Sequence, residues 1–164
     1  VEDYCQKVRE PVLRRARQLS ADETKDLTQL ESIWYEGEVR NHEHYNWTRY
    51  YALNLHSVFY KGTVEFRCFN STLHAGRAAA YINLCLAMSA QAIAQRSTVM
   101  RKTQSDNELF TFRVWLVRLG LNGPEFKNTR DHLLANLSGD RAWRYDKDSY
   151  EVNKKKKKNR GTER

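Results

Sequence analysis

Two neighbouring stretches decide the fold, Tyr51-Ala52-Leu53-Asn54-Leu55-His56-Ser57-Val58-Phe59 and Thr63-Val64-Glu65-Phe66-Arg67-Cys68-Phe69. Apolar and polar side chains alternate along both of them, which predicts β-strands. Lys61-Gly62 stands between the stretches and is typical of a two-residue turn. We therefore expect an antiparallel hairpin in which His56 faces Arg67 and Val58 faces Glu65.

This hairpin would have one apolar and one polar face. Its apolar face would carry Leu53, Leu55, Phe59, Val64, Phe66 and Cys68. On the polar face Glu65 and Arg67 lie roughly 6.6 Å apart along the strand, because successive side chains alternate. Asn54 and His56 would complete a polar floor. A carboxylate suits a hard cation such as Mg²⁺ and a guanidinium suits a phosphate oxygen, but the same spacing also describes a surface ion pair.

The longer strings around this pair carry more information than the spacing. They are Arg49-Tyr50-Tyr51-Ala52-Leu53-Asn54-Leu55 and Gly62-Thr63-Val64-Glu65-Phe66-Arg67-Cys68-Phe69-Asn70-Ser71-Thr72-Leu73-His74-Ala75. Both resemble the core motif of the amidoligase family, which is related to glutamine synthetase and glutamate-cysteine ligase. The later run 115–121, with 125–127 and 132–134, resembles the C-terminal helices of that family, so the likeness extends over residues 49–143.

The resemblance implies an ATP- and Mg²⁺-dependent ligase that joins a carboxylate to an amine through an acyl phosphate. By position in the motif, Glu65 would bind the metal and Arg67 would stabilise the transferred phosphoryl group. Lesser polar contacts to the nucleotide would come from Arg49, Asn54 and Asn70. The partners would be small-molecule or peptide carboxylates and amines.

One part of the family pattern is missing from this sequence. Members carry an earlier strand with two alternating glutamates that supply further metal-binding carboxylates, and nothing before Arg49 matches it; Glu36-Gly37-Glu38-Val39 is a poor substitute. A single carboxylate and one arginine are too few for two metals and a triphosphate. We therefore expect the first half of the catalytic sheet to lie upstream in a longer protein, and this chain alone to have little activity.

Helical patterns surround the predicted hairpin. Residues 4–19 form a basic helix that Pro11 either divides or begins, and Ser20 with Glu23 has the spacing of a capping box for a second helix to residue 37. After the hairpin we expect helices over 76–96, over 108–119 with Asp106 as N-cap and Gly120 as its end, and over 129–137 with Thr129 as N-cap. His74 would cap the first of these or contact substrate.

The fold class expected is α+β, an antiparallel hairpin packed on several helices as part of a glutamine-synthetase-like catalytic fold. Residues 1–47 would be a helical insertion or linker, 48–145 the C-terminal half of the catalytic domain and 146–164 a basic disordered tail. No apolar run reaches the length of a membrane span. Three cysteines, Cys5, Cys68 and Cys85, form neither a disulfide framework nor a zinc motif, which favours a reducing, cytoplasmic location.

Other features have a structural and a functional interpretation. Of the net charge of +8, most lies in the tail after residue 153, so nucleic acid is an expected partner only through that tail. His42-Glu43-His44 lacks a third metal ligand. Tyr45, Trp47, Tyr50 and Tyr51 would close a core or stack on an adenine. The alternative function is a non-catalytic module that binds nucleic acid or protein through the basic helix over residues 9–17 and the tail.

Overall fold

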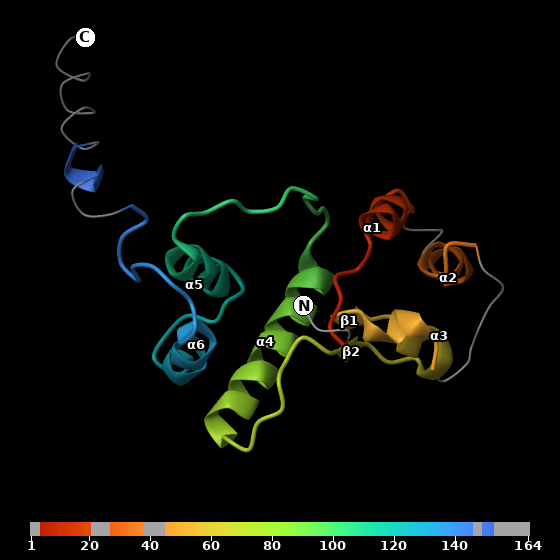
Figure 1. Cartoon of the computed structure of the whole chain (residues 1–164), viewed down its shortest axis with the longest axis horizontal. Coiled ribbons are helices and arrows are strands. Elements are labelled where there is room, and N and C mark those ends of the chain that lie inside the picture. Colours follow the sequence, from red (N-terminus) through yellow and green to blue (C-terminus); the bar gives the residue numbers. More distant parts are fainter. Residues whose placement is uncertain (1–3, 21–26, 38–44, 146–148, 153–164) are drawn as a thin grey trace, which may run out of the picture. The chain divides into compact units, whose positions relative to one another are not determined.

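The computed structural model describes residues 4–20, 27–37, 45–145 and 149–152. Helices make up most of this part of the chain, together with one small antiparallel sheet, as Figure 1 shows. The chain divides into two compact units, residues 1–71 and 72–164. The expected α+β class is therefore confirmed only in its coarse form, as helices with a short antiparallel pairing.

The core of unit 1 lies between two short helices and the start of the sheet. Helix α1 (Glu10–Arg17) begins with Pro11 in its first turn, where a missing backbone N–H costs nothing, and α2 (Thr28–Trp34) follows it. Their apolar side chains pack around Tyr51, with Val12, Ile33, Trp34 and Tyr35 all buried. Of the predicted capping box before α2, Glu23 lies outside the described residues.

The sheet of unit 1 pairs β1 (Leu53–Asn54) with β2 (Glu65–Phe66). The pairing is antiparallel, as expected, but its register differs from the prediction. Leu53 faces Phe66 and Asn54 faces Glu65, whereas the sequence pattern had placed His56 opposite Arg67 and Val58 opposite Glu65. The prediction of a long hairpin was wrong because the chain between the strands forms a helix.

That helix is α3 (His56–Lys61), which Gly62 ends in the left-handed conformation at φ 71°. The polar and apolar residues of this segment fit a helical period as well as an alternating one. Leu55 and Phe59, four residues apart, pack against the core of unit 1, and the rings of His56 and Tyr60 stack at 6.2 Å. The segment is therefore a helix with one face packed against the core, and not the strand that the alternating pattern predicted.

A buried polar contact joins α3 to Tyr35, the residue that follows α2. His56 is 4% exposed, and its Nδ1 and the hydroxyl of Tyr35 share a hydrogen bond of 2.5 Å. His56 consequently belongs to the core rather than to the polar floor that the sequence suggested. Burial, with the Glu31 carboxylate as a second cause, raises the pKa of Tyr35 to about 12.

This buried tyrosine predicts an alkaline loss of stability. The unfolded chain releases the Tyr35 proton at the ordinary pKa of about 10, while the folded chain retains it to about 12, so the stabilisation is complete below about pH 10 and is lost as the pH rises through this window. Urea unfolding from pH 8 to 12 should show a steeper fall for the wild type than for Tyr35→Phe. Tyr45→Phe, at a 77% exposed side chain, is the control, and equal slopes for all three proteins would contradict the prediction.

Unit 2 is helical. Its long helix α4 (Ala75–Ala94) packs against α6 (Lys127–Leu134), and α6 also contacts α5 (Glu108–Arg118), as Figure 1 shows. Ala80 and Leu84 of α4, Leu116 of α5 and Leu134 of α6 are buried. The helices predicted over 76–96 and 108–119 thus match α4 and α5 to within two residues at each end.

Two predicted N-caps of unit 2 were wrong, and both for tertiary reasons. The cap of α5 is Asn107, not Asp106: its Oδ1 accepts from the Phe110 amide while its Nδ2 donates to the carbonyls of Asp140 and Trp143. An aspartate could not donate those two bonds. Thr129 lies inside α6, which begins two residues earlier, and its buried hydroxyl accepts a hydrogen bond from Asn83 of α4 at 2.9 Å.

Two other predictions about helix ends were correct. His74 is the N-cap of α4, with its Nδ1 accepting from the Arg77 amide at 3.3 Å, and Gly120 follows α5 with φ 87°. Within the described ranges, no helix is long and apolar enough to cross a bilayer.

Candidate active site

The site begins where the short sheet places Asn54 opposite Glu65. In an antiparallel pair, opposed side chains lie on the same face. The Asn54 Nδ2 donates to Glu65 Oε2 at 2.6 Å, and Arg67 Nη1 donates to Glu65 Oε1 at 2.9 Å. The carboxylate is therefore held between an amide and a guanidinium, with both of its oxygens oriented.

Arg67 takes its position from one further step of the same pairing. Its backbone N–H donates to the carbonyl of Ala52 at 2.8 Å, so Ala52 stands opposite Arg67 as Asn54 stands opposite Glu65. The guanidinium of Arg67 lies over the ring of Tyr50, with its central carbon 5.6 Å from the ring centroid.

Tyr50 is where a second arginine joins the group. The guanidinium carbon of Arg49 lies 5.7 Å from the same ring centroid, so one aromatic ring contacts two cations. Such contacts hold guanidinium planes while leaving N–H groups at their edges for other acceptors. Arg49, Tyr50, Asn54, Glu65 and Arg67 together form what we call the arginine–glutamate site.

The backbone around Tyr50 is fixed from two sides. Tyr50 ends the 3₁₀ turn η1 (Trp47–Tyr50), which starts at Asn46, whose side-chain Oδ1 accepts from the Thr48 amide at 2.9 Å and from its hydroxyl at 2.6 Å. From the other side the Gln6 amide donates to the Tyr50 carbonyl at 2.8 Å, and the ring of Tyr4 packs edge-on against Tyr50 at 5.4 Å. The N-terminal segment thus supports the site directly.

The site is graded from a buried base to an open edge. Asn54 is 2% exposed, the Arg67 side chain 19% and the Glu65 side chain 46%. The buried Asn54 Oδ1 and Arg67 Nε have no hydrogen-bond partner among the described residues, which is uncommon for atoms out of contact with water. The Glu65 carboxylate is therefore accessible from solvent, while its partners Asn54 and Arg67 are more deeply buried.

The five residues that the sequence proposed for the site are placed unequally. Contacts join Arg49, Asn54, Glu65 and Arg67, whereas Asn70 is exposed and takes no part in those contacts. Sequence reasoning did not single out Tyr50, which it grouped with its aromatic neighbours. The available signal was its position in the sequence, immediately before the segment whose Ala52 and Asn54 face Arg67 and Glu65.

The aromatic neighbours of Tyr50 have different surroundings. Tyr51 is 1% exposed and contacts the rings of Trp34 and Trp47, so it closes the core of unit 1. Trp47 and Tyr45 are 45% and 77% exposed. Tyr50 ends η1 and Tyr51 begins the extended backbone, and their rings have different surroundings, with Tyr51 in the core and Tyr50 in the site.

Other candidate groups gain no support as metal or nucleophile sites. His42-Glu43-His44 lies outside the described residues, and in the ranges that the structure does describe no three His, Cys, Asp or Glu side chains gather as metal ligands. Cys85 is half-buried and burial raises the pKa of its thiol. Cys68 is exposed, contrary to the expected apolar face, because β2 ends at Phe66 and the alternation does not continue.

Comparisons with known proteins relate to the same region. A family model described as "Putative amidoligase enzyme" matches residues 1–89, more than half of the chain, and this range contains the whole arginine–glutamate site. No curated protein and no solved structure matches the chain. The strings that resembled the amidoligase motif at 49–75 fall within the matched range, and the chain belongs to this amidoligase family.

Proposed function

We propose that the chain catalyses ATP- and Mg²⁺-dependent formation of an amide bond between a carboxylate and an amine. The observation that carries the proposal is the hydrogen-bonded line from Asn54 through Glu65 to Arg67, beside a second arginine, in a member of the amidoligase family. In this reaction a carboxylate oxygen attacks the γ-phosphorus and ADP leaves. The amine nitrogen then attacks the acyl carbon, loses its proton, and phosphate departs with one oxygen of the original carboxylate.

Arg67 is suited to the first of these steps. A phosphoryl group in transfer gains negative charge on its oxygens, and a guanidinium held in advance stabilises that charge without reorganising. One nitrogen of Arg67 contacts Glu65 and the ring of Tyr50 fixes its plane, so the remaining N–H groups can face a phosphate. Arg49, on the same ring, would add a second positive charge for the nucleotide.

The described residues fit Mg²⁺ in only one way. Glu65 is the single carboxylate of the site, and its oxygens already accept from Asn54 and Arg67. Mg²⁺ is commonly held by one or two carboxylates together with substrate phosphates and water. Glu65 would therefore hold the ion jointly with the nucleotide, where the ion neutralises phosphate charge, and the buried Asn54 would keep the carboxylate in orientation. Asn70, which is exposed, stays a proposed polar contact to the nucleotide.

This arrangement predicts opposite effects for two substitutions, measured by calorimetric titration of the full chain with the non-hydrolysable analogue AMP-PNP. With Mg²⁺, weak but saturable binding should decrease about tenfold in both Glu65→Gln and Arg67→Ala. Without Mg²⁺, Arg67→Ala should still weaken binding because it removes a phosphate ligand. Glu65→Gln should strengthen it, since it removes a negative charge that repels the phosphates.

Arg101→Ala is the matched control, because Arg101 is an exposed arginine of unit 2. The proposal fails if the wild type binds no nucleotide with Mg²⁺ present, or if Glu65→Gln leaves the Mg²⁺ dependence unchanged. In the second case Glu65 and Arg67 would be a surface ion pair and nothing more.

The alternative function, a module that binds nucleic acid through the basic helix, gains little from the structure. Among the described residues, two of the four arginines of that segment pair with acids: Arg9 with Glu36, and Arg14 with Glu10 at 2.8 Å. The remaining charge of α1 is small for a phosphate-binding surface. The basic residues at 154–164 lie outside the described residues.

A further inference from the structure

Unit 2 contains a cavity of about 710 Å³ along α5. Glu108, Thr111, Trp115 and Arg118 line it from one side of the helix, at spacings of three and four residues. The distance from Glu108 to Arg118 along the axis is roughly 15 Å at ~1.5 Å per residue. The size is in the range of about 300–1,000 Å³ that is usual for small-molecule sites.

Two segments form the opposite wall of the cavity, and hydrogen bonds attach both of them to the start of α5. Ser105 Oγ and Thr111 Oγ1 lie 2.6 Å apart, which holds the segment that carries Thr103 and Gln104. Asn107 donates to the carbonyls of Asp140 and Trp143 and so holds the chain that brings Arg144 to the cavity. The walls therefore come from three segments that are bonded to one another.

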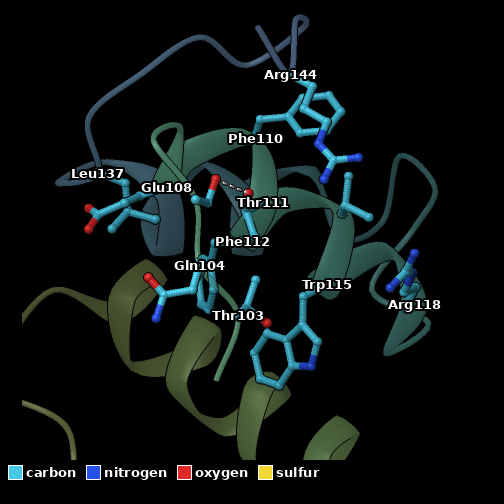
Figure 2. A pocket seen from close by; sticks show the side chains of 12 residues that line it. Thr103, Gln104, Glu108, Phe110, Thr111, Phe112, Trp115, Arg118, Leu137 and Arg144 are labelled. Carbon is cyan, nitrogen blue, oxygen red and sulfur yellow. Dashed lines mark hydrogen bonds between the residues drawn. The ribbon is translucent and has the colours of Figure 1, made fainter. Parts of the chain in front are cut away.

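Charge and ring distribution decide which ligand suits this cavity. Figure 2 shows Phe112 and Trp115 on α5 facing Thr103 and Gln104, with Arg144 near Phe110, Arg118 beyond Trp115, and Glu108 at the left. The rings of Phe112 and Trp115 lie 5.4 Å apart. Neither Arg118 nor Arg144 forms an ion pair with an acidic side chain in the part of the chain that the structure describes.

We propose that this cavity, the α5 cavity, binds an organic anion with a flat apolar body. The aromatic rings would cover the apolar body, and Arg118 and Arg144 would attract the anionic group. The two arginines outnumber the single acid, Glu108, so the cavity favours negative ligands. The inference does not depend on the proposed ligase activity, because none of its residues belongs to the arginine–glutamate site.

The test uses two fluorescent probes of similar body and different charge, 8-anilinonaphthalene-1-sulfonate and neutral N-phenyl-1-naphthylamine. We expect one saturable sulfonate site per chain, with Arg118→Gln and Arg144→Gln each weakening it about three- to fivefold and hardly changing the neutral probe. Trp115→Leu should weaken the binding of both probes. Glu108→Gln should strengthen only the sulfonate.

Two control variants separate the α5 cavity from unspecific binding. Arg101→Gln removes an exposed charge that does not line the cavity, and Leu86→Ser removes a 63% exposed apolar side chain of α4. Neither control variant should change the affinity for either probe. The inference is overturned if the sulfonate and the neutral probe respond alike to all variants, or if Leu86→Ser weakens binding more than Trp115→Leu does.

Discussion

Replacing Arg67 by alanine should lower carboxylate-dependent ADP formation by about 10²- to 10³-fold, the usual loss when one preorganised charge donor is removed from a transition state. The fold should be retained, because the ion pair with Glu65 is partly open to solvent and such pairs contribute little to stability. The backbone bond from the Arg67 amide to the Ala52 carbonyl does not depend on the side chain.

The measurement follows oxygen rather than turnover alone. If the full chain is incubated with Mg-ATP, ammonium and a panel of ¹⁸O-labelled carboxylates that includes glutamate, an acyl phosphate route transfers one ¹⁸O from the carboxylate to each released phosphate. Mass spectrometry of that phosphate suits slow turnover, which we expect of a site with one carboxylate. Simple ATP hydrolysis would instead place an oxygen from water in the phosphate.

Arg67→Lys distinguishes charge from geometry. A lysine keeps the positive charge but lacks the planar fork that can contact Glu65, the Tyr50 ring and a phosphate together. It should therefore recover only part of the loss, while Arg101→Ala should match the wild type. Equal label transfer in the wild type and Arg67→Ala would remove Arg67 from the mechanism.

The sequence predicted those parts of the site in which the backbone of one segment alone sets the direction of the side chains. Residues two apart on an extended segment share a face in any register, so the neighbourhood of Glu65 and Arg67 could be predicted and their ion pair is what the structure has. The partner strand could not be aligned in the same way. Its register depends on the length of the connection, and α3 shortened the paired part to a few residues.

α3 shows why local pattern was insufficient there. A run of six residues is too short for one period to exclude the other, and propensities in such a run are easily overridden by packing. What decides for the helix is tertiary: His56 bonds to Tyr35, and Phe59 packs on the same ring at 5.8 Å. Tyr35 is far away in sequence, so no local pattern contains this information.

In unit 2 the prediction of elements and the prediction of caps had different outcomes for a related reason. The long apolar periods of α4 and α5 fix a helix wherever the chain packs, and their ends fell within two residues of expectation. A cap is a single side chain with a choice of partners. Asn107 and Thr129 were both recruited by distant groups, the carbonyl of Trp143 and the amide of Asn83.

Trp34→Ala should destabilise unit 1 by about 3–5 kcal/mol, the range for removing a large aromatic side chain from a core. Trp34 is 2% exposed and its ring packs edge-on against Tyr51 at 5.2 Å. The residue before Tyr51 is Tyr50, whose ring holds both arginines. Loss of the core support should therefore also weaken Mg-AMP-PNP binding, although no atom of Trp34 belongs to the site.

Trp47→Ala is a matched control on the same neighbour, because the ring of Trp47 contacts Tyr51 at 5.6 Å but is 45% exposed. It should destabilise unit 1 by only about 1 kcal/mol. Trp34→Phe should lie close to the wild type, since it keeps a ring and removes a buried indole N–H that has no acceptor among the described residues.

Native-state hydrogen exchange resolves these effects within one molecule. In Trp34→Ala the amides of Gln6 and Arg67, which bond to carbonyls beside Tyr51, should exchange faster, while the amides of α4 and α6 in unit 2 keep their wild-type protection. Equal acceleration in both units would mean that the core around Tyr51 is not a local support. The separation of the tyrosines, with one in the core and the next in the site, would then fail to explain how the arginines are held.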